Sequence, residues 1–156
     1  MAKRNLSADV LTCLAGKRLA TAESLTGGGI GQAITSVSGA SAVYAGGIIS
    51  YTNEVKNKVL GVPVEMLDAF GAVSTPVAQA MAEGAARVLD AHVAVAVTGL
   101  AGPGGDEFGN PVGTVFIGYA DPGKAFAREY HFIGSREDIR EQTICVALAL
   151  ILEQNQ

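Results

Sequence analysis

Ser24 is the candidate nucleophile of the sequence, because it lies between a short apolar segment and a run of glycines. We expect a strand over residues 19–23, and the segment 26–31 that follows contains three consecutive glycines. A serine at such a turn can present its hydroxyl beside backbone N–H groups, which could stabilise the oxyanion of an acyl-transfer reaction. The same position also suits a serine that only caps the following helix.

A hydrolytic serine needs a base, and a lysine is the best candidate for it here. His92 begins a strand at the end opposite the glycine turn, and His131 lies in an edge-like strand with no evident carboxylate partner. Neither a G-x-S-x-G elbow nor an S-x-x-K motif is present. Tyr51 and Lys56 lie around one strand-to-helix turn, and Ser–Lys pairs act as catalytic dyads on other folds. As a base Lys56 needs a pKa lowered by burial or by a neighbouring positive charge; otherwise it is an ordinary surface lysine.

A second glycine-rich turn, at residues 99–105, comes directly after the apolar segment 92–97. In open α/β sheets ligands bind beyond the carboxyl ends of strands, and a turn that opens a helix can hold an anion on its N–H groups. Neither turn has the Walker A or the G-x-G-x-x-G spacing, so both could also be tight turns in a closely packed protein. The candidate substrate-binding residues in the two turns are Thr26, Gly27, Gly28, Gly99 and Gly102.

Arg136 and Arg140 are the candidate contacts for an anionic group. They lie four residues apart on the expected last helix, so they share one face of it. They could clamp a phosphate or a carboxylate, or they could pair with the neighbouring Glu137 and Glu141.

The composition predicts one closely packed domain over residues 1–156. Of these residues 49% are apolar and 17% are charged, below the roughly 25% of an average domain, and the 20 glycines cluster without a three-residue period. A net charge of −4 without a Lys/Arg stripe argues against a nucleic-acid partner, and no apolar stretch is long enough for a membrane span. We expect no metal site, a cytoplasmic location with Cys13 and Cys145 as buried free thiols, and a homo-oligomer.

Helices and strands alternate along the sequence, as in α/β folds. We expect helices over 7–17, 30–39, 53–60, 64–70, 76–88 and 136–151, and strands over 19–23, 43–51, 92–97, 113–120 and 125–133. The last two strands form a hairpin around 121–123, and Ser135 opens the last helix with a capping box. The predicted fold is a three-layer α/β/α sandwich with a mixed, mostly parallel sheet.

Five motifs in order resemble the C-terminal domain of the CinA (competence/damage-inducible) family, also known as the nicotinamide-nucleotide amidase family. They are TAESLTGG at 21–28, YTNEVK at 51–56, GAVS at 71–74, TGLAGPGG at 98–105 and PVGTV at 111–115. The resemblance runs from about residue 5 to 153 and is to the stand-alone form. The molybdopterin-binding-like N-terminal domain of many relatives has no counterpart here, so we expect no pyrophosphatase activity.

The resemblance implies a hydrolase that converts nicotinamide mononucleotide (NMN) to nicotinate mononucleotide and ammonia without a cofactor. Ser24 matches the family's nucleophile, Lys56 its general base and Tyr51 a tyrosine that assists this dyad. Thr98 matches a threonine that lines the site, and the family's site arginine matches either Arg136 or Arg140. The amides of residues 27–29 would then stabilise the oxyanion.

The alternative is a noncatalytic module that binds a nucleotide or a protein and is linked to competence or DNA damage. Such a module could use the glycine turns, but it would have no use for a Ser–Lys pair. A phosphoryl-transfer enzyme is disfavoured by the missing Walker lysine and metal carboxylates.

Overall fold

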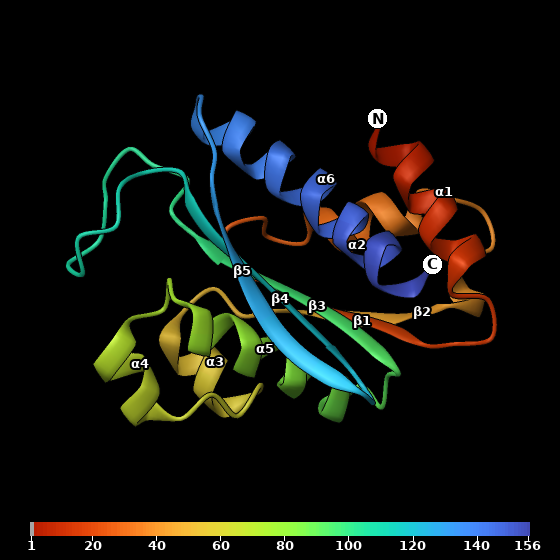
Figure 1. Cartoon of the computed structure of the whole chain (residues 1–156), viewed down its shortest axis with the longest axis horizontal. Helices are drawn as coiled ribbons and strands as arrows, with labels where there is room; N and C mark the ends of the chain where they lie inside the picture. The colour runs from red at the N-terminus through yellow and green to blue at the C-terminus, as the bar shows by residue number, and fades with distance from the viewer. Residues whose placement is uncertain (1) are drawn as a thin grey trace.

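A five-stranded sheet covered by helices on both faces forms the protein in the computed structural model, which describes residues 2–156 (Figure 1). The elements in chain order are α1 (Lys3–Cys13), β1 (Leu19–Glu23), α2 (Gly29–Thr35), the 3₁₀ turn η1 (Ala40–Ala42), β2 (Tyr44–Ile49), α3 (Asn53–Lys58), α4 (Val64–Phe70), α5 (Thr75–Val88), β3 (Val93–Gly99), β4 (Thr114–Asp121), β5 (Lys124–His131) and α6 (Arg136–Asn155). The predicted three-layer α/β/α sandwich is confirmed.

The strands lie in the order β2-β1-β3-β4-β5. β1 runs parallel to β2 and β3, whereas β4 runs antiparallel to β3 and β5. The sheet is therefore mixed, with its parallel half at β2-β1-β3 and the predicted hairpin at β4-β5. Because parallel strands end at the same edge of a sheet, the segments after β1, β2 and β3 are brought together there.

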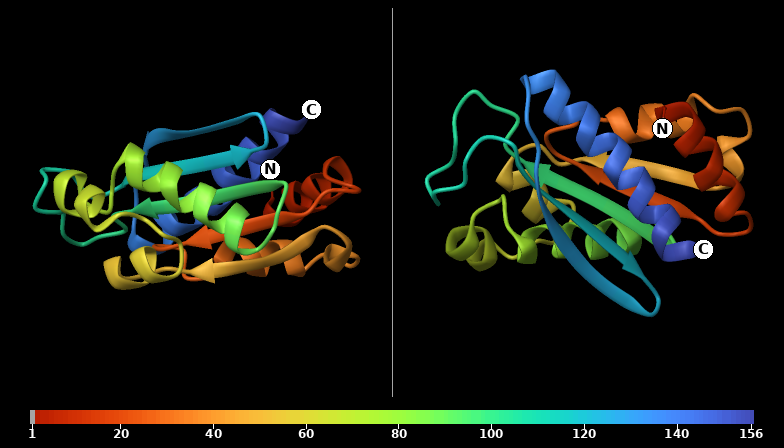
Figure 2. Two further views of the ribbon diagram at one scale, coloured as in Figure 1. Left: turned by 90° about the horizontal axis from the view of Figure 1, so that it is seen from below. Right: turned by 45° about the horizontal axis from the view of Figure 1, so that its top comes forward.

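Helices lie on both faces of the sheet (Figure 2), and alternate residues of its inner strands pack against different helical layers. Leu19 and Val95 pack in the core beneath α1, α2 and α6, whereas Ala20 and Ala96 pack beneath α5. The second layer is close because small residues face it: a Cβ at Gly118 of β4 would overlap the carbonyl oxygen of Ala78 on α5. This close approach explains part of the high glycine and alanine content.

Several predicted element boundaries were wrong. α1 begins at Lys3 and not at Ser7, because Leu6 and Val10 form one buried face and Ser7 itself is buried within the helix. α2 ends at Thr35, before the expected stop at Gly39. The helix expected over 76–88 begins one residue earlier, at Thr75, so its N-cap is Ser74.

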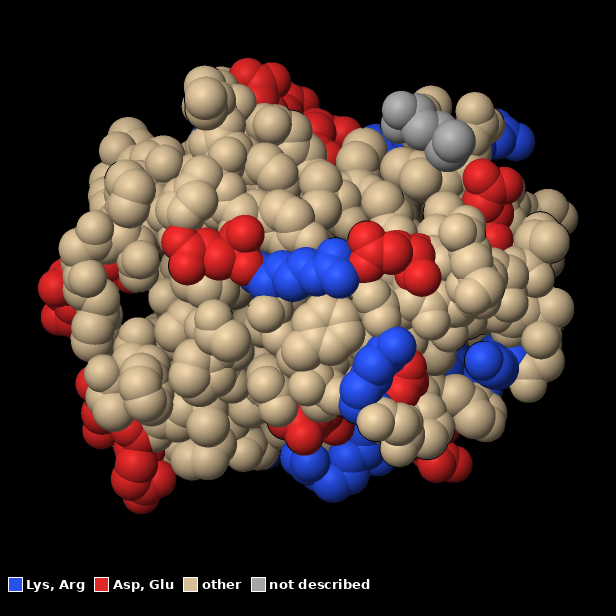
Figure 3. All heavy atoms as spheres, viewed as in Figure 1, with Lys and Arg blue, Asp and Glu red and all other residues tan. Residues whose placement is uncertain are grey.

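The N-terminus of α6 has the predicted capping box. Ser135 Oγ accepts a hydrogen bond from the Asp138 N–H at 3.1 Å, and the Asp138 carboxylate accepts one from the Ser135 N–H at 2.9 Å. The box fixes where α6 starts and so places Arg136 beside the loop that follows β3. Within residues 2–156, no helix combines the length and apolar character needed to cross a membrane. On the face drawn in Figure 3, basic side chains lie among acidic ones and not in a continuous stripe.

Candidate active site

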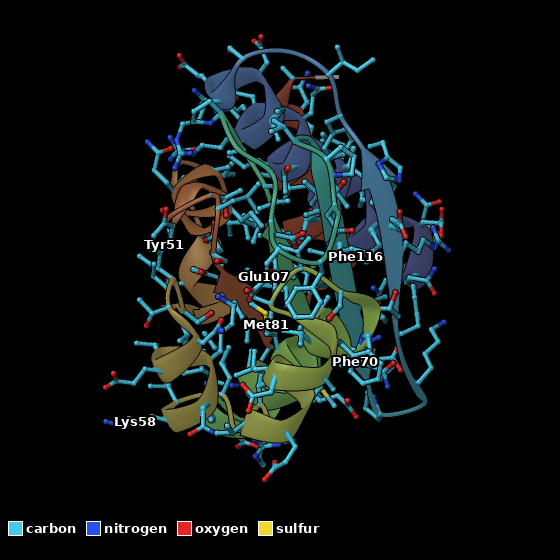
Figure 4. All side chains as sticks on the ribbon, turned by 90° about the vertical axis from the view of Figure 1, so that its left-hand side faces the viewer. Tyr51, Lys58, Phe70, Met81, Glu107 and Phe116 are labelled. Atoms are coloured by element: carbon cyan, nitrogen blue, oxygen red, sulfur yellow. The ribbon has the colours of Figure 1, made fainter. Side chains whose placement is uncertain are left out.

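A cavity of about 310 Å³ lies at the carboxyl ends of β1 and β3, where both glycine-rich turns begin. Figure 4 views this end of the molecule, with Tyr51 near one rim and Glu107 on the long loop between β3 and β4. The cavity is lined by Ser24, Leu25, Tyr51, Asn53, Lys56, Ala72, Val73, Thr98, Gly99, Leu100, Ala101, Gly102, Gly104 and Arg136. The chain thus brings together at one cavity several residues that were singled out in the sequence.

Ser24 and Lys56, which are 32 residues apart in the chain, are in direct contact at this cavity. The distance between Ser24 Oγ and Lys56 Nζ is 3.1 Å. Both residues are almost completely buried, with exposed fractions of 7% and 1%. Ser24 follows β1 and Lys56 lies on α3, so the contact depends on the packing of α3 against the edge of the sheet.

Two backbone carbonyls hold the Lys56 amine in place. Lys56 Nζ donates to the carbonyl oxygens of Ser50 at 2.8 Å and Tyr51 at 3.1 Å. A neutral amine has two N–H groups and one lone pair. With its two hydrogens directed to these carbonyls, a neutral Lys56 has its lone pair left for the Ser24 proton, whereas a charged Lys56 would donate to all three oxygens.

The environment of Lys56 favours this neutral form. Burial lowers the pKa of Lys56 from its usual 10.5 to about 8, because the charged ammonium loses its hydration. Among the described residues no carboxylate forms an ion pair with it. At pH 8 about half of the Lys56 amines are neutral, against about 0.3% of lysines with an unperturbed pKa. From the sequence alone, a lowered pKa could be stated only as a requirement for a catalytic Lys56. The structure shows the burial that lowers it.

Backbone hydrogen bonds to neighbouring strands fix the chain around Ser24. The Ser24 N–H donates to the Val97 carbonyl of β3 at 3.1 Å, and the Ser50 N–H donates to the Glu23 carbonyl at 2.8 Å. Ser50 therefore links Lys56, which it contacts directly, to Glu23, the residue before Ser24. Sequence reasoning missed Ser50, because its contribution is made by backbone groups that carry no signature in the sequence.

Glu23 is a buried carboxylate that sequence reasoning also missed. It is 2% exposed and accepts hydrogen bonds from the Thr26 hydroxyl at 2.6 Å, the Ile30 N–H at 2.8 Å and the Gly31 N–H at 3.0 Å. The first turn of α2 was expected to hold a substrate anion, but it holds this carboxylate. A glutamate at the end of an otherwise apolar strand was the available signal, since buried carboxylates need partners.

The first glycine turn, residues 26–31, contributes no residue to the cavity lining, which includes only Ser24 and Leu25 just before it. The Thr26 side chain is directed to Glu23, and Gly27 and Gly28 have φ angles of 58° and 103° that favour glycine. The Gly27 N–H donates to the Ser24 carbonyl at 3.1 Å, and the Gly29 N–H to the Thr26 carbonyl at 3.0 Å. Two of the three amides expected to hold an oxyanion are therefore already occupied, and the third, that of Gly28, belongs to a residue that does not line the cavity.

The second glycine turn borders the cavity directly. Gly99 and Gly102 are among its lining residues, and Thr98 is 1% exposed beside them. The Thr98 hydroxyl donates to the Ala72 carbonyl at 2.9 Å, which ties β3 to the segment before α5. A side chain at Gly99 would press against Val115, so the backbone runs close to β4 at this point.

The two candidate arginines have different surroundings. Arg136 lines the cavity, and its guanidinium donates to the Gly102 carbonyl. Arg140 instead reaches the outside of the first turn, where it donates to the Thr26 carbonyl at 3.3 Å. Neither arginine is ion-paired within residues 2–156, and Glu141 pairs with Lys3 at 2.7 Å. The structure therefore favours Arg136 for a ligand in the cavity and Arg140 for support of the turn.

Tyr51 contributes to the site through its backbone as well as its ring. Its carbonyl accepts from Lys56, whereas its side chain is 60% exposed at the cavity rim. An exposed aromatic ring next to a cavity is free to contact a ligand.

Among residues 2–156, the histidines, cysteines and carboxylates form no group of three that could hold a metal ion. His92 Nδ1 accepts from the Arg18 N–H at 2.9 Å, at the opposite end of the sheet. His131 has a carboxylate partner after all, since its Nε2 lies 2.6 Å from Glu129. Cys13 and Cys145 are free thiols, but both are half-buried and not fully buried.

Comparison with known proteins gives consistent results. The family model for the CinA C-terminal domain matches residues 4–155. The chain is 44% identical over 136 residues to a Pseudomonas putida protein named nicotinamide-nucleotide amidohydrolase PncC. The aligned residues cover 87% of this chain and 85% of that protein. It is 47% identical over 133 residues to a CinA-like protein of Geobacter sulfurreducens, covering 85% of this chain and 32% of that protein. The chain thus spans about a third of the length of the CinA-like relatives it matches.

Solved structures show the same fold. The competence damage-inducible protein A (ComA) of Klebsiella pneumoniae superposes with a TM-score of 0.96 at 35% identity, covering 99% of this chain and 97% of that one. The competence/damage inducible protein CihA of Agrobacterium tumefaciens gives a TM-score of 0.95 at 39% identity, covering 99% and 96%.

Proposed function

The chain belongs to the CinA C-terminal domain family, and from this premise we propose that it hydrolyses the carboxamide of NMN to give nicotinate mononucleotide and ammonia. The relative named nicotinamide-nucleotide amidohydrolase PncC supports the choice of substrate, because the similarity covers most of both chains. The observation that carries the proposal is the 3.1 Å contact between Ser24 Oγ and Lys56 Nζ, with both groups buried at a cavity.

In the first half of the proposed reaction Lys56 is the general base and Ser24 the nucleophile. The neutral amine accepts the hydroxyl proton of Ser24, and the oxygen attacks the carboxamide carbon. The positively charged pyridinium ring withdraws electrons from this carbon, which makes it more electrophilic than a peptide carbonyl. The product of this step is a tetrahedral intermediate with a negatively charged oxygen.

The oxyanion needs hydrogen-bond donors at the cavity. The N–H groups of Gly27 and Gly29 are engaged within the turn, and Gly28 does not line the cavity, so we assign the role to the N–H of Leu25, the residue after the nucleophile. Leu25 lines the cavity, and no backbone carbonyl in the described part of the chain accepts its N–H. The residue after a nucleophilic serine supplies such a donor in other hydrolases.

The second half of the reaction returns the proton and releases the product. Protonated Lys56 donates its proton to the leaving nitrogen, so ammonia departs and the acyl group remains on Ser24. Water, activated by the again neutral Lys56, attacks this ester, and the Ser24 hydroxyl is restored. The balance is one carboxamide and one water converted to one carboxylic acid and one ammonia.

We assign substrate binding to the second glycine turn and to Arg136. The guanidinium of Arg136 is charged at any working pH and can make paired hydrogen bonds with a phosphate. The exposed ring of Tyr51 also lines the cavity, where it can pack against the substrate. A cavity of about 310 Å³ is at the lower end of the range for small-molecule sites, which suits a mononucleotide that is partly exposed.

The noncatalytic alternative fails to explain why Lys56 is buried. Burying a lysine whose charge is not paired destabilises the folded state, and a nucleotide-binding module would derive no benefit from its contact with Ser24. We further propose that the protein acts in the cytoplasm, because Cys13 and Cys145 are both free thiols, and that it forms a homo-oligomer, as its low charge suggests.

Ammonia release from NMN tests the function and the mechanism together. We expect Ser24→Ala and Lys56→Met to lose activity by about 10³-fold or more, as removal of one member of a catalytic unit does in serine hydrolases. Ser41→Ala and Lys58→Met are matched controls at exposed positions and should keep wild-type activity. A folded wild-type protein that releases no ammonia would refute the function. Undiminished activity of Ser24→Ala would refute the mechanism alone.

A further inference from the structure

Glu23 precedes the nucleophile, yet the proposed chemistry does not use it. Its carboxylate is buried on the α2 side of the sheet and is not among the groups that line the cavity. We infer that Glu23 is a positioning residue, which holds the turn after Ser24 in shape through Thr26 and so keeps the serine hydroxyl at Lys56. For its effect on turnover this inference rests on the proposed function.

The backbone on the strand side of Ser24 is fixed without help from Glu23's side chain. The Ser24 N–H is bonded to Val97, and the Glu23 carbonyl accepts from Ser50. On the other side the chain enters a turn with two glycines in the left-handed region, Gly27 and Gly28, where the backbone has the most freedom. The orientation of the serine therefore depends on what holds this turn.

The Glu23 carboxylate spans the turn from its start to its end. One oxygen accepts from the Thr26 hydroxyl at 2.6 Å and from the Ile30 N–H at 2.8 Å, and the other accepts from the Gly31 N–H at 3.0 Å. Hydrogen bonds to a charged carboxylate are stronger than neutral ones, and burial strengthens them further. The carboxylate thus joins the residue before Ser24 to the turn and to the first turn of α2.

Arg140 contacts the same turn from outside, by donating to the Thr26 carbonyl at 3.3 Å. Thr26 is thereby held on both its side chain and its backbone. The bond to Glu23 is the shorter of the two, and it is made at a residue that is 1% exposed. Thr26 was predicted to bind substrate, but its hydroxyl is directed to Glu23.

Glutamine at position 23 keeps the size of the side chain and removes the charge. Its oxygen can still accept from Thr26 and Ile30. Its NH2 group, however, takes the place of the oxygen that accepts from the Gly31 N–H, so that two donors face each other. The turn must shift to relieve this contact. Since a displacement of about 1 Å in reacting groups can reduce rates about 100-fold, we expect Glu23→Gln to lower kcat by about 10- to 100-fold while KM changes less than about threefold.

The Thr26 variants test whether Glu23 acts through this hydroxyl. Thr26→Val should lower kcat as Glu23→Gln does, and Thr26→Ser should restore it to within about threefold of wild type. The double variant Glu23→Gln/Thr26→Val should be little worse than the poorer single variant, because the bond from Gly31 lost in one and the bond from Thr26 lost in the other hold the same turn. Glu83→Gln, at an exposed glutamate of α5, controls for loss of a negative charge.

A readout that does not involve NMN separates this inference from the proposed function. The rate at which a fluorophosphonate labels Ser24, followed by intact mass, reports the readiness of the serine alone. We expect wild type to be labelled, and Glu23→Gln and Thr26→Val to be labelled at least 10-fold more slowly with unchanged circular dichroism.

Labelling of both variants at the wild-type rate, an unlabelled wild type, or an effect confined to KM would overturn the positioning role. If Glu23→Gln does not fold, Thr26→Val and Thr26→Ser decide by the same criteria. If labelling behaves as expected but NMN is not hydrolysed, the positioning role stands and the proposed substrate is wrong.

Discussion

Replacing Lys56 by methionine should remove a pH-dependent contribution to the stability of the protein, and this contribution reveals the buried amine. Methionine has a similar length and no charge, and it leaves the carbonyls of Ser50 and Tyr51 without their donor at every pH. The loss of these hydrogen bonds is therefore a constant offset. What changes with pH is only the cost of burying a proton on Lys56.

The magnitude follows from the two pKa values of this lysine. Its pKa is about 8 in the folded protein and 10.5 when the chain is unfolded, so between these values the unfolded state binds more protons. The free energy of unfolding of the wild type must then rise with pH across this window. Between pH 7 and pH 10 the rise due to Lys56 is about 2 to 3 kcal/mol, at about 1.4 kcal/mol for each unit of pKa difference. Lys56→Met has no such contribution.

The assay is urea unfolding at pH 7 and pH 10, followed by circular dichroism because the chain contains no tryptophan. We expect the free energy of unfolding of wild type minus that of Lys56→Met to increase by about 2 to 3 kcal/mol between the two pH values, since the other titrating groups cancel in the difference. The matched control is Lys58→Met, because the Lys58 side chain is 69% exposed. The free energy of unfolding of wild type minus that of Lys58→Met should not change with pH. If the difference in free energy of unfolding between wild type and Lys56→Met is constant or falls with pH, the charged form of Lys56 is not destabilised by burial and the reasoning is refuted.

Two further predictions concern activity. The kcat/KM of the wild type should rise with pH to a plateau with an apparent pKa of about 8, by roughly 50-fold between pH 6 and pH 8, because only neutral Lys56 accepts the serine proton; a rate that is constant over pH 6–9 contradicts this role. Arg136→Ala should raise the KM for NMN by about 10-fold or more, as loss of a charged hydrogen bond to phosphate does, whereas Arg140→Ala should act mainly on kcat through the turn at Thr26; the reverse pattern in steady-state kinetics would exchange the roles of the two arginines.

The secondary structure and the fold class followed from local patterns. Alternation of apolar residues, the Ser135 capping box and the glycine turns each act within a few residues, so the strand over 19–23 and the helix over 64–70 were predicted to the residue. The errors lay at boundaries where burial outweighs local signals. Ser7 is suited to a helix cap, but Leu6 and Val10 extend the buried face of α1 past it.

The candidate residues were also visible in the sequence, but their roles needed the fold. Ser24, Lys56, Thr98 and Arg136 lie in separate segments. The parallel half of the sheet brings the first three to one cavity, and the start of α6 adds Arg136 beside the loop that follows β3. The pair of His131 and Glu129, by contrast, does not depend on distant segments, since the two residues are two apart on the same side of β5. That pair could have been predicted from strand alternation alone.

The sequence by itself determined which elements form and which chemical groups are available, because helix caps, turns and apolar periodicity are local properties. Only the tertiary structure decided that Lys56 is buried against Ser24, with its pKa lowered by the loss of hydration. It likewise decided that the first turn of α2 is filled by Glu23. Burial and contact between distant segments are properties of the packed chain, and the reactivity of a lysine or a serine depends on them.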